Sequence, residues 1–216
     1  KLGSLYNRGG DFDRAIRFYN RALTGSGLTE SSRDQSLQGL GYAHFRKHQY
    51  NEALRCFKRL QEESKDQQVR PDVLNHISRI YLARGQLGRS ERYAQEALEL
   101  VRGTGREILL ASIYGNLGDI HFFQGRFSTS INYLERALDL LPPEGEGYLR
   151  SRISAGIARV HLHYGDLEVT YKFLEDALYH AQFTGDRVYM VEIEARIGQI
   201  FEWDGRLDRA QEVYEQ

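Results

Sequence analysis

Apolar residues recur at spacings of three and four along most of the chain, which is the period of an amphipathic helix. Phe127, Ile131, Leu134 and Leu138 form one such series, and Tyr114, Leu117 and His121 form the series before it. A strand would require apolar and polar residues to alternate, and no segment sustains that alternation between turns. The pattern therefore predicts an all-α protein.

The apolar series come in pairs, and a short break separates the two members of each pair. Gln124-Gly125-Arg126 lies between the two series above. Glycine ends a helix readily because it adopts the left-handed backbone conformation. Pro142-Pro143 then stops the second helix, because proline cannot continue one. The spacing predicts two antiparallel helices joined by a tight turn.

This helix pair repeats along the chain. The turn residue recurs at Gly85, Gly125, Gly165 and Gly205, with Gly10 and His48 in the equivalent places earlier. Seven residues before these turns lie Gly3, Gly41, Ser78, Gly118, Ala158 and Gly198. Five residues after them lie Ala15, Ala53, Ser90, Ser130, Thr170 and Ala210. Small residues at fixed places are expected where two helices approach closely. We expect one domain over residues 1–216, with units at 1–27, 28–65, 66–106, 107–146, 147–186 and 187–216, the first and last incomplete.

The repeats also carry a family pattern. Leu2-Gly3-x2-Tyr6 is followed by Ala15-x3-Tyr19, and Leu40-Gly41-x2-His44 is followed by Ala53-x3-Phe57. These residues resemble the W-x2-L-G-x2-Y and A-x3-F pattern of tetratricopeptide repeats. The resemblance extends over essentially the whole chain. It implies a right-handed superhelical solenoid of about six antiparallel helix pairs, whose concave groove binds a protein or peptide partner.

The units are longer than the 34 residues usual in this family. Spacings of 40 residues separate Gly85, Gly125, Gly165 and Gly205, and the linkers read TGR at 104–106 and TGD at 184–186. These features resemble the long-repeat subgroup found in LGN/Pins-type spindle adaptors. Similar long repeats also occur in bacterial peptide-sensing regulators and in many signalling proteins.

The resemblance assigns a concave face to the first helix of each unit, at places set by the small residue. The candidate partner-binding residues are Tyr42, Phe45, Arg46, Asn75, Arg79, Asn116, Asp119, Phe122, Phe123, Arg152, Arg159, His163, Arg196, Gln199 and Trp203. Aromatic and arginine side chains often anchor interfaces. A structural interpretation stands beside this one, because the aromatics can pack on the next repeat and the arginines can pair with Asp119 and Glu192. The family's carboxylate clamp also needs lysines, and only Asn116 is in place, so binding of a chaperone's C-terminal peptide is not expected.

The composition of the chain excludes some classes of partner. The chain holds 29 basic and 30 acidic residues, a net charge of -1, so there is no bulk attraction to nucleic acid or to an anionic membrane. No apolar run approaches the roughly 18 residues that span a bilayer. The single Cys56 cannot form an internal disulfide, which fits a reducing, cytoplasmic location. The chain begins inside a first helix and ends inside a second, so further repeats or domains are expected beyond it.

Candidate chemistry is sparse. His44 and His48 lie four residues apart like two zinc ligands, but "HFRKH" lacks the glutamate of a metalloprotease motif and offers no third ligand. No phosphate-binding loop, nucleophile elbow or Cys/His pair is present. We therefore expect no enzyme activity, no cofactor and no metal.

Two other functions remain open. Helical repeats can bind RNA with one base per unit, but Tyr42, Arg79, Asp119, Arg159 and Gln199 share one place in the repeat without a common chemistry. The ends of the stack could instead mediate self-association, through residues such as Tyr6 and Tyr214.

Overall fold

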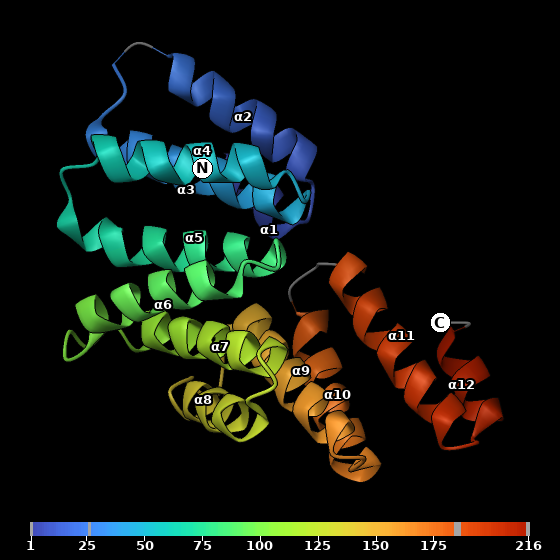
Figure 1. Ribbon diagram of the computed structural model, residues 1–216. Helices are drawn as coiled ribbons and strands as arrows, with labels where there is room; N and C mark the ends of the chain where they lie inside the picture. Colours follow the sequence, from blue (N-terminus) through green and yellow to red (C-terminus); the bar gives the residue numbers. More distant parts are fainter. Residues whose placement is uncertain (1, 26, 184–186, 215–216) are drawn as a thin grey trace. The chain divides into compact units, whose positions relative to one another are not determined.

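The computed structural model describes the backbone of residues 2–25, 27–183 and 187–214, with all their side chains except those of 187–189, 192 and 214. Over these residues the regular structure is helical (Figure 1). The helices are α1 (Leu2–Arg8), α2 (Phe12–Thr24), α3 (Glu30–Arg46), α4 (Tyr50–Glu63), α5 (Arg70–Ala83), α6 (Leu87–Val101), α7 (Glu107–Phe123), α8 (Phe127–Asp139), α9 (Gly147–His163), α10 (Leu167–Gln182), α11 (Arg187–Trp203) and α12 (Leu207–Tyr214), with a 3-10 turn η1 (Gln67–Val69). The predicted all-α fold is confirmed.

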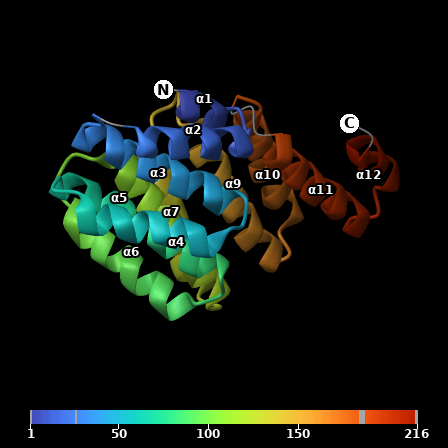
Figure 2. The same cartoon turned by 90° about the horizontal axis from the view of Figure 1, so that it is seen from above.

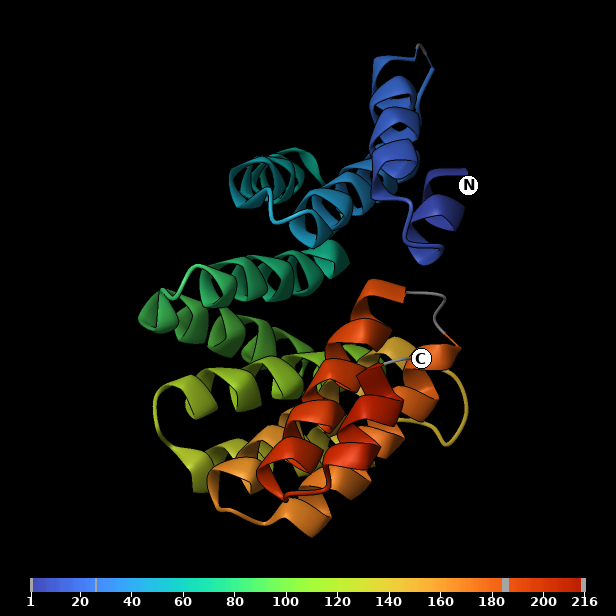
Figure 3. The same cartoon turned by 90° about the vertical axis from the view of Figure 1, so that its right-hand side faces the viewer.

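The chain forms two compact units, Lys1–Leu109 and Leu110–Gln216, called here the N-terminal and C-terminal units. In the N-terminal unit each helix from α1 to α6 packs against the next, and Figures 1 and 2 show α3 lying against α4. In the C-terminal unit α8, α9, α10, α11 and α12 do the same, and Figure 3 shows α11 beside α12. Each unit is thus a stack of helix hairpins. The division into six repeats stays a prediction.

Small residues let the two helices of a hairpin touch. A Cβ on Gly118 of α7 would lie 2.5 Å from Leu134 Cγ of α8, closer than any real contact. Ser130 of α8 donates a hydrogen bond to the Gly118 carbonyl oxygen at 2.7 Å. The hairpin of α5 and α6 uses serines instead, since Ser78 Oγ donates to the Ser90 carbonyl at 2.9 Å and Ser90 Oγ to the Ser78 carbonyl at 2.8 Å. These buried hydroxyls are therefore satisfied at the closest point of the hairpin.

The turn residues all have a left-handed backbone. Gly10, Gly85, Gly125, Gly165 and Gly205 have φ between 70° and 76°, and His48 has φ 58°. The amide of His48 donates to the Phe45 carbonyl at 2.9 Å, and the next amide, of Gln49, donates to the His44 carbonyl at 2.9 Å. This pair of hydrogen bonds is a Schellman cap, which satisfies the last carbonyls of a helix. The predicted helix breaks are therefore correct, including the break at a residue that is not glycine.

The close approach at Gly118 predicts that even one methyl group destabilises the α7–α8 hairpin. Gly118→Ala should lower the free energy of unfolding by about 1–3 kcal/mol, because Leu134 must shift. Gly88→Ala is the matched control, since Gly88 lies in helix α6 and its added Cβ would meet nothing within 4 Å. That change should be neutral or stabilise by up to about 1 kcal/mol. Chemical denaturation followed by circular dichroism tests both, and equal effects would contradict the packing argument.

The left-handed turn at His48 predicts a stabilising substitution. A side chain in this conformation is strained by about 1–2 kcal/mol relative to glycine, while His48 gains one exposed hydrogen bond between its Nδ1 and the Tyr50 hydroxyl at 2.9 Å. His48→Gly should raise the free energy of unfolding by about 1 kcal/mol. His48→Ala keeps the Cβ and should bring no gain. A stabilising alanine in the same denaturation assay would show that strain is not the cause.

Candidate partner-binding site

The C-terminal unit places one acidic residue between two arginines. Arg152 Nη1 of α9 donates to Asp119 Oδ2 of α7 at 2.8 Å, and Arg159 Nη2 donates to the other oxygen, Oδ1. The side chains of Asp119 and Arg152 are largely buried. Buried charges persist only where they are paired. Because two cations share one carboxylate, the three groups together keep one positive charge.

Two glycines make room for these ion pairs. A Cβ on Gly115 of α7 would lie 2.7 Å from Arg152 Nη2. A Cβ on Gly156 of α9 would lie 3.0 Å from Leu134 and 3.5 Å from Asp119 Oδ1. Helices α7 and α9 can therefore approach closely enough for the short Asp119 side chain to reach both arginines.

Aromatic rings cover the other side of Arg159. Its guanidinium carbon lies 4.7 Å from the centre of the Phe122 ring and 5.2 Å from that of Phe123. His163 stacks on Phe127 with ring centroids 3.6 Å apart. Phe123 is 56% exposed. Cation–π contacts and the Asp119 ion pair together hold Arg159 in one position.

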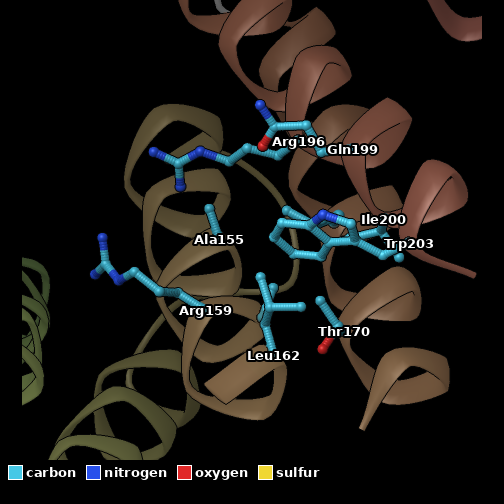
Figure 4. Close-up of a pocket in the computed structure, with 10 residues that line it drawn as sticks. Ala155, Arg159, Leu162, Thr170, Arg196, Gln199, Ile200 and Trp203 are labelled. Atoms are coloured by element: carbon cyan, nitrogen blue, oxygen red, sulfur yellow. The ribbon is translucent and has the colours of Figure 1, made fainter. Parts of the chain in front are cut away.

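A cleft opens between α9, α10 and α11 in the same unit. Its volume is about 200 Å³. It is lined by Ala155, Ala158, Arg159, Leu162, Thr170, Leu174, Arg196, Gln199, Ile200 and Trp203. Figure 4 shows the indole of Trp203 at one end beside Ile200, whereas Arg159 and Arg196 extend toward the other end. We call this the Trp203 cleft. It combines an apolar pocket with two cationic side chains.

The Trp203 cleft brings together four of the residues selected from the sequence. Arg159 comes from α9, and Arg196, Gln199 and Trp203 come from three successive turns of α11. Trp203 is 65% exposed, so its ring is available to a partner.

In the N-terminal unit the selected residues pack mainly on one another. Arg46 lies over the Phe12 ring at 4.9 Å and donates from Nη1 to the Tyr42 hydroxyl at 3.1 Å. Arg79 lies over the Phe45 ring at 5.0 Å. Of these residues Tyr42 lines a broad groove of about 660 Å³. The charged groups of Arg46 and Arg79 therefore contribute to packing within the unit.

Two selected residues need correction. Asn75 is 3% exposed and Asn116 is fully buried, so neither side chain presents a surface to a partner. Both side chains therefore belong to the interior of their units rather than to a peptide-binding groove.

Sequence reasoning missed residues of two kinds. Thr170 and Leu174 reach the Trp203 cleft from α10, a second helix, although the register considered first helices only. Asn7 lines the groove in the N-terminal unit and lies four places after Gly3. The same register, applied to the incomplete first unit, would have selected it. No sequence signal of that kind points to the α10 residues.

The described part of the chain offers little other chemistry. No three His, Cys, Asp or Glu side chains there lie close enough together to hold a metal ion. Burial raises the pKa of the Cys56 thiol to about 11, so the reactive thiolate is scarce at neutral pH. No described helix is long and apolar enough to cross a bilayer.

Two segments of the chain match sequence models of a known repeat family. Residues 70–142 match one sequence model of the tetratricopeptide repeat and residues 1–33 match another. These two segments are therefore similar to tetratricopeptide repeats. The hairpins between and after them have the same left-handed turns, at His48, Gly165 and Gly205. No curated protein matches the sequence of this chain.

Solved structures share the fold at low sequence identity. A Rap protein complexed with competence and sporulation factor matches with a TM-score of 0.75 and 15% identity, over 94% of this chain and 56% of that one. NprR in complex with its cognate peptide NprX matches with a TM-score of 0.71 and 10% identity, over 94% and 59%. A tetratricopeptide-repeat protein of Thermus thermophilus matches with a TM-score of 0.62 and 19% identity, over 84% and 88%. This chain thus spans little more than half of the Rap protein and of NprR.

His76 lines the groove in the N-terminal unit, and its pKa predicts that the free energy of unfolding depends on pH. Burial, and next the charge of Arg79, lowers the pKa of His76 from 6.5 to about 3. The unfolded chain takes up this proton below about pH 6.5 and the folded chain does not. The low pKa of His76 therefore leaves the free energy of unfolding unchanged above pH 6.5 and decreases it as the pH falls from 6.5 toward 3.

This loss should reach at most about 2 kcal/mol between about pH 7 and about pH 5. Urea unfolding of the wild type and of His76→Gln at both pH values measures it. The variant should lose less stability than the wild type over this interval. An equal loss in the two proteins would mean that His76 is not responsible.

Proposed function

We propose that this protein is an interaction module that binds a segment of a partner protein, as a peptide or a helix, against its first helices. The observation that carries the proposal is the Trp203 cleft. Pockets that bind a partner combine exposed apolar surface with a few polar groups that set orientation. Trp203 supplies the first property, and Arg196 and Gln199 supply the second. The proposal contains no catalytic step.

Three further observations support this function. The matched segments resemble a family whose stacked helices form extended binding surfaces. Of two proteins with a similar fold, NprR was crystallised with its cognate peptide and a Rap protein with competence and sporulation factor. The spacing of 40 residues between the later turn glycines supports the long-repeat subgroup.

A displayed library of random short peptides, selected on the purified protein, tests the proposal. Selected peptides should bind at least about tenfold more weakly to Trp203→Ala, because an exposed tryptophan in a cleft is a common hot spot. Fluorescence anisotropy of labelled peptides measures the affinity. The matched control is Leu207→Ala, since Leu207 is also 65% exposed but lies on α12 outside the cleft.

The control should bind as the wild type does. If both variants bind equally well, the peptides use another surface and the cleft is not the site. If selection enriches no peptide that binds the wild type, the proposed function is wrong.

A further inference from the structure

The charges around the Trp203 cleft indicate what kind of segment it accepts. The group of Asp119, Arg152 and Arg159 keeps one positive charge, and Arg196 adds a second. Within the described residues, no carboxylate forms an ion pair with Arg196. An exposed guanidinium beside an apolar pocket attracts a carboxylate and can bind it through two parallel hydrogen bonds.

The two arginines are held differently. Arg159 is fixed by Asp119 on one side and by the rings of Phe122 and Phe123 on the other. Arg196 is exposed on α11 and extends along the same cleft (Figure 4). Arg159 therefore supplies a fixed positive field, whereas Arg196 can turn toward a ligand and donate hydrogen bonds to it.

The volume of the cleft limits the size of the apolar side chain that a ligand can place in it. Apolar cavities of about 150 Å³ hold a benzene-sized group, so the volume of about 200 Å³ accommodates one large aliphatic or aromatic side chain. Leu162, Ile200 and Trp203 surround that space. Gln199, on the same helix as Arg196, offers an amide to the backbone of the bound segment.

We propose that the Trp203 cleft binds an acidic peptide segment in which a carboxylate lies close to one large apolar side chain. The inference rests on the proposed function and adds the chemistry of the partner. The apolar side chain enters the pocket beside Trp203, and the carboxylate pairs with Arg196 in the field of Arg159. An acidic peptide is favoured over RNA because the net charge of -1 gives no bulk attraction to a phosphate backbone, whereas one carboxylate needs only the local charge of Arg159 and Arg196.

The protein contains its own reporter for this test. Trp203 is the sole tryptophan of the chain, so its fluorescence reports the cleft directly when the ligands contain none. Four ligands are compared: an acidic peptide with one central leucine, its analogue with glutamine and asparagine in place of the acids, its analogue with serine in place of leucine, and oligouridylate. All four are titrated at about 50 mM and about 500 mM salt, because exposed ion pairs weaken with ionic strength.

The acidic leucine peptide should shift the emission of Trp203 to shorter wavelength. At low salt it should bind at least about tenfold more tightly than either altered peptide, and high salt should remove most of the difference from the neutral one. Equal binding of the acidic and neutral peptides would overturn this inference and leave the proposed function intact. Tighter binding of oligouridylate would overturn the inference in favour of RNA. If none of the three peptides binds, the inference fails, and the selection from the peptide library decides the proposed function separately.

A charge reversal locates the contact. Arg196→Glu should weaken binding of the acidic peptide at least about tenfold and leave the neutral peptide unchanged. Arg209→Glu is the matched control, because Arg209 is an exposed arginine on α12, outside the cleft, and makes the same change in net charge. Circular dichroism confirms that both variants are folded. If the two variants weaken binding equally, the preference comes from net charge and the assignment to Arg196 is wrong.

Discussion

The structure depends on how closely the two helices of each hairpin can approach. At Gly118 there is no room for a methyl group, and at Ser78 and Ser90 each hydroxyl bonds to the opposite backbone. A larger side chain at these places would separate the helix axes and change where every residue of the first helix points. Small residues therefore determine the hairpin geometry, while the apolar residues around them supply most of the burial energy.

Close approach of two helices at small residues also shapes the candidate site. Gly115 and Gly156 bring α7 and α9 together, and this contact puts Asp119 within reach of both Arg152 and Arg159. The ion pairs in turn fix Arg159 beside the Trp203 cleft. The position of the Arg159 charge beside the cleft thus depends on the close packing of α7 and α9. Packing and recognition are linked by one short aspartate side chain.

Periodicity and turn chemistry were enough to predict the fold. The helix breaks at Gly85 and Gly125 follow from the φ that glycine permits, and even His48 was placed correctly by its position in the repeat. The functional face was harder, because a register says which way a side chain points but not how closely the next helix packs. Asn116 was selected by resemblance to relatives, yet its side chain is fully buried. Thr170 and Leu174 were missed because they approach the cleft from a second helix. Both errors concern packing between helices, which the register of a single helix does not describe.

The hairpin turns have a consequence for how such a chain tolerates change. An added Cβ at Gly10, Gly85, Gly125, Gly165 or Gly205 would find no atom within 4 Å. The backbone there faces open space, and the amides of the turn residue and of the residue after it donate to carbonyls in the last turn of the preceding helix. Surface loops of this kind accept inserted sequence far better than packed segments do. A tag or a label could therefore be grafted beside such a turn with little effect on the core, provided that the left-handed residue and its capping hydrogen bonds are kept.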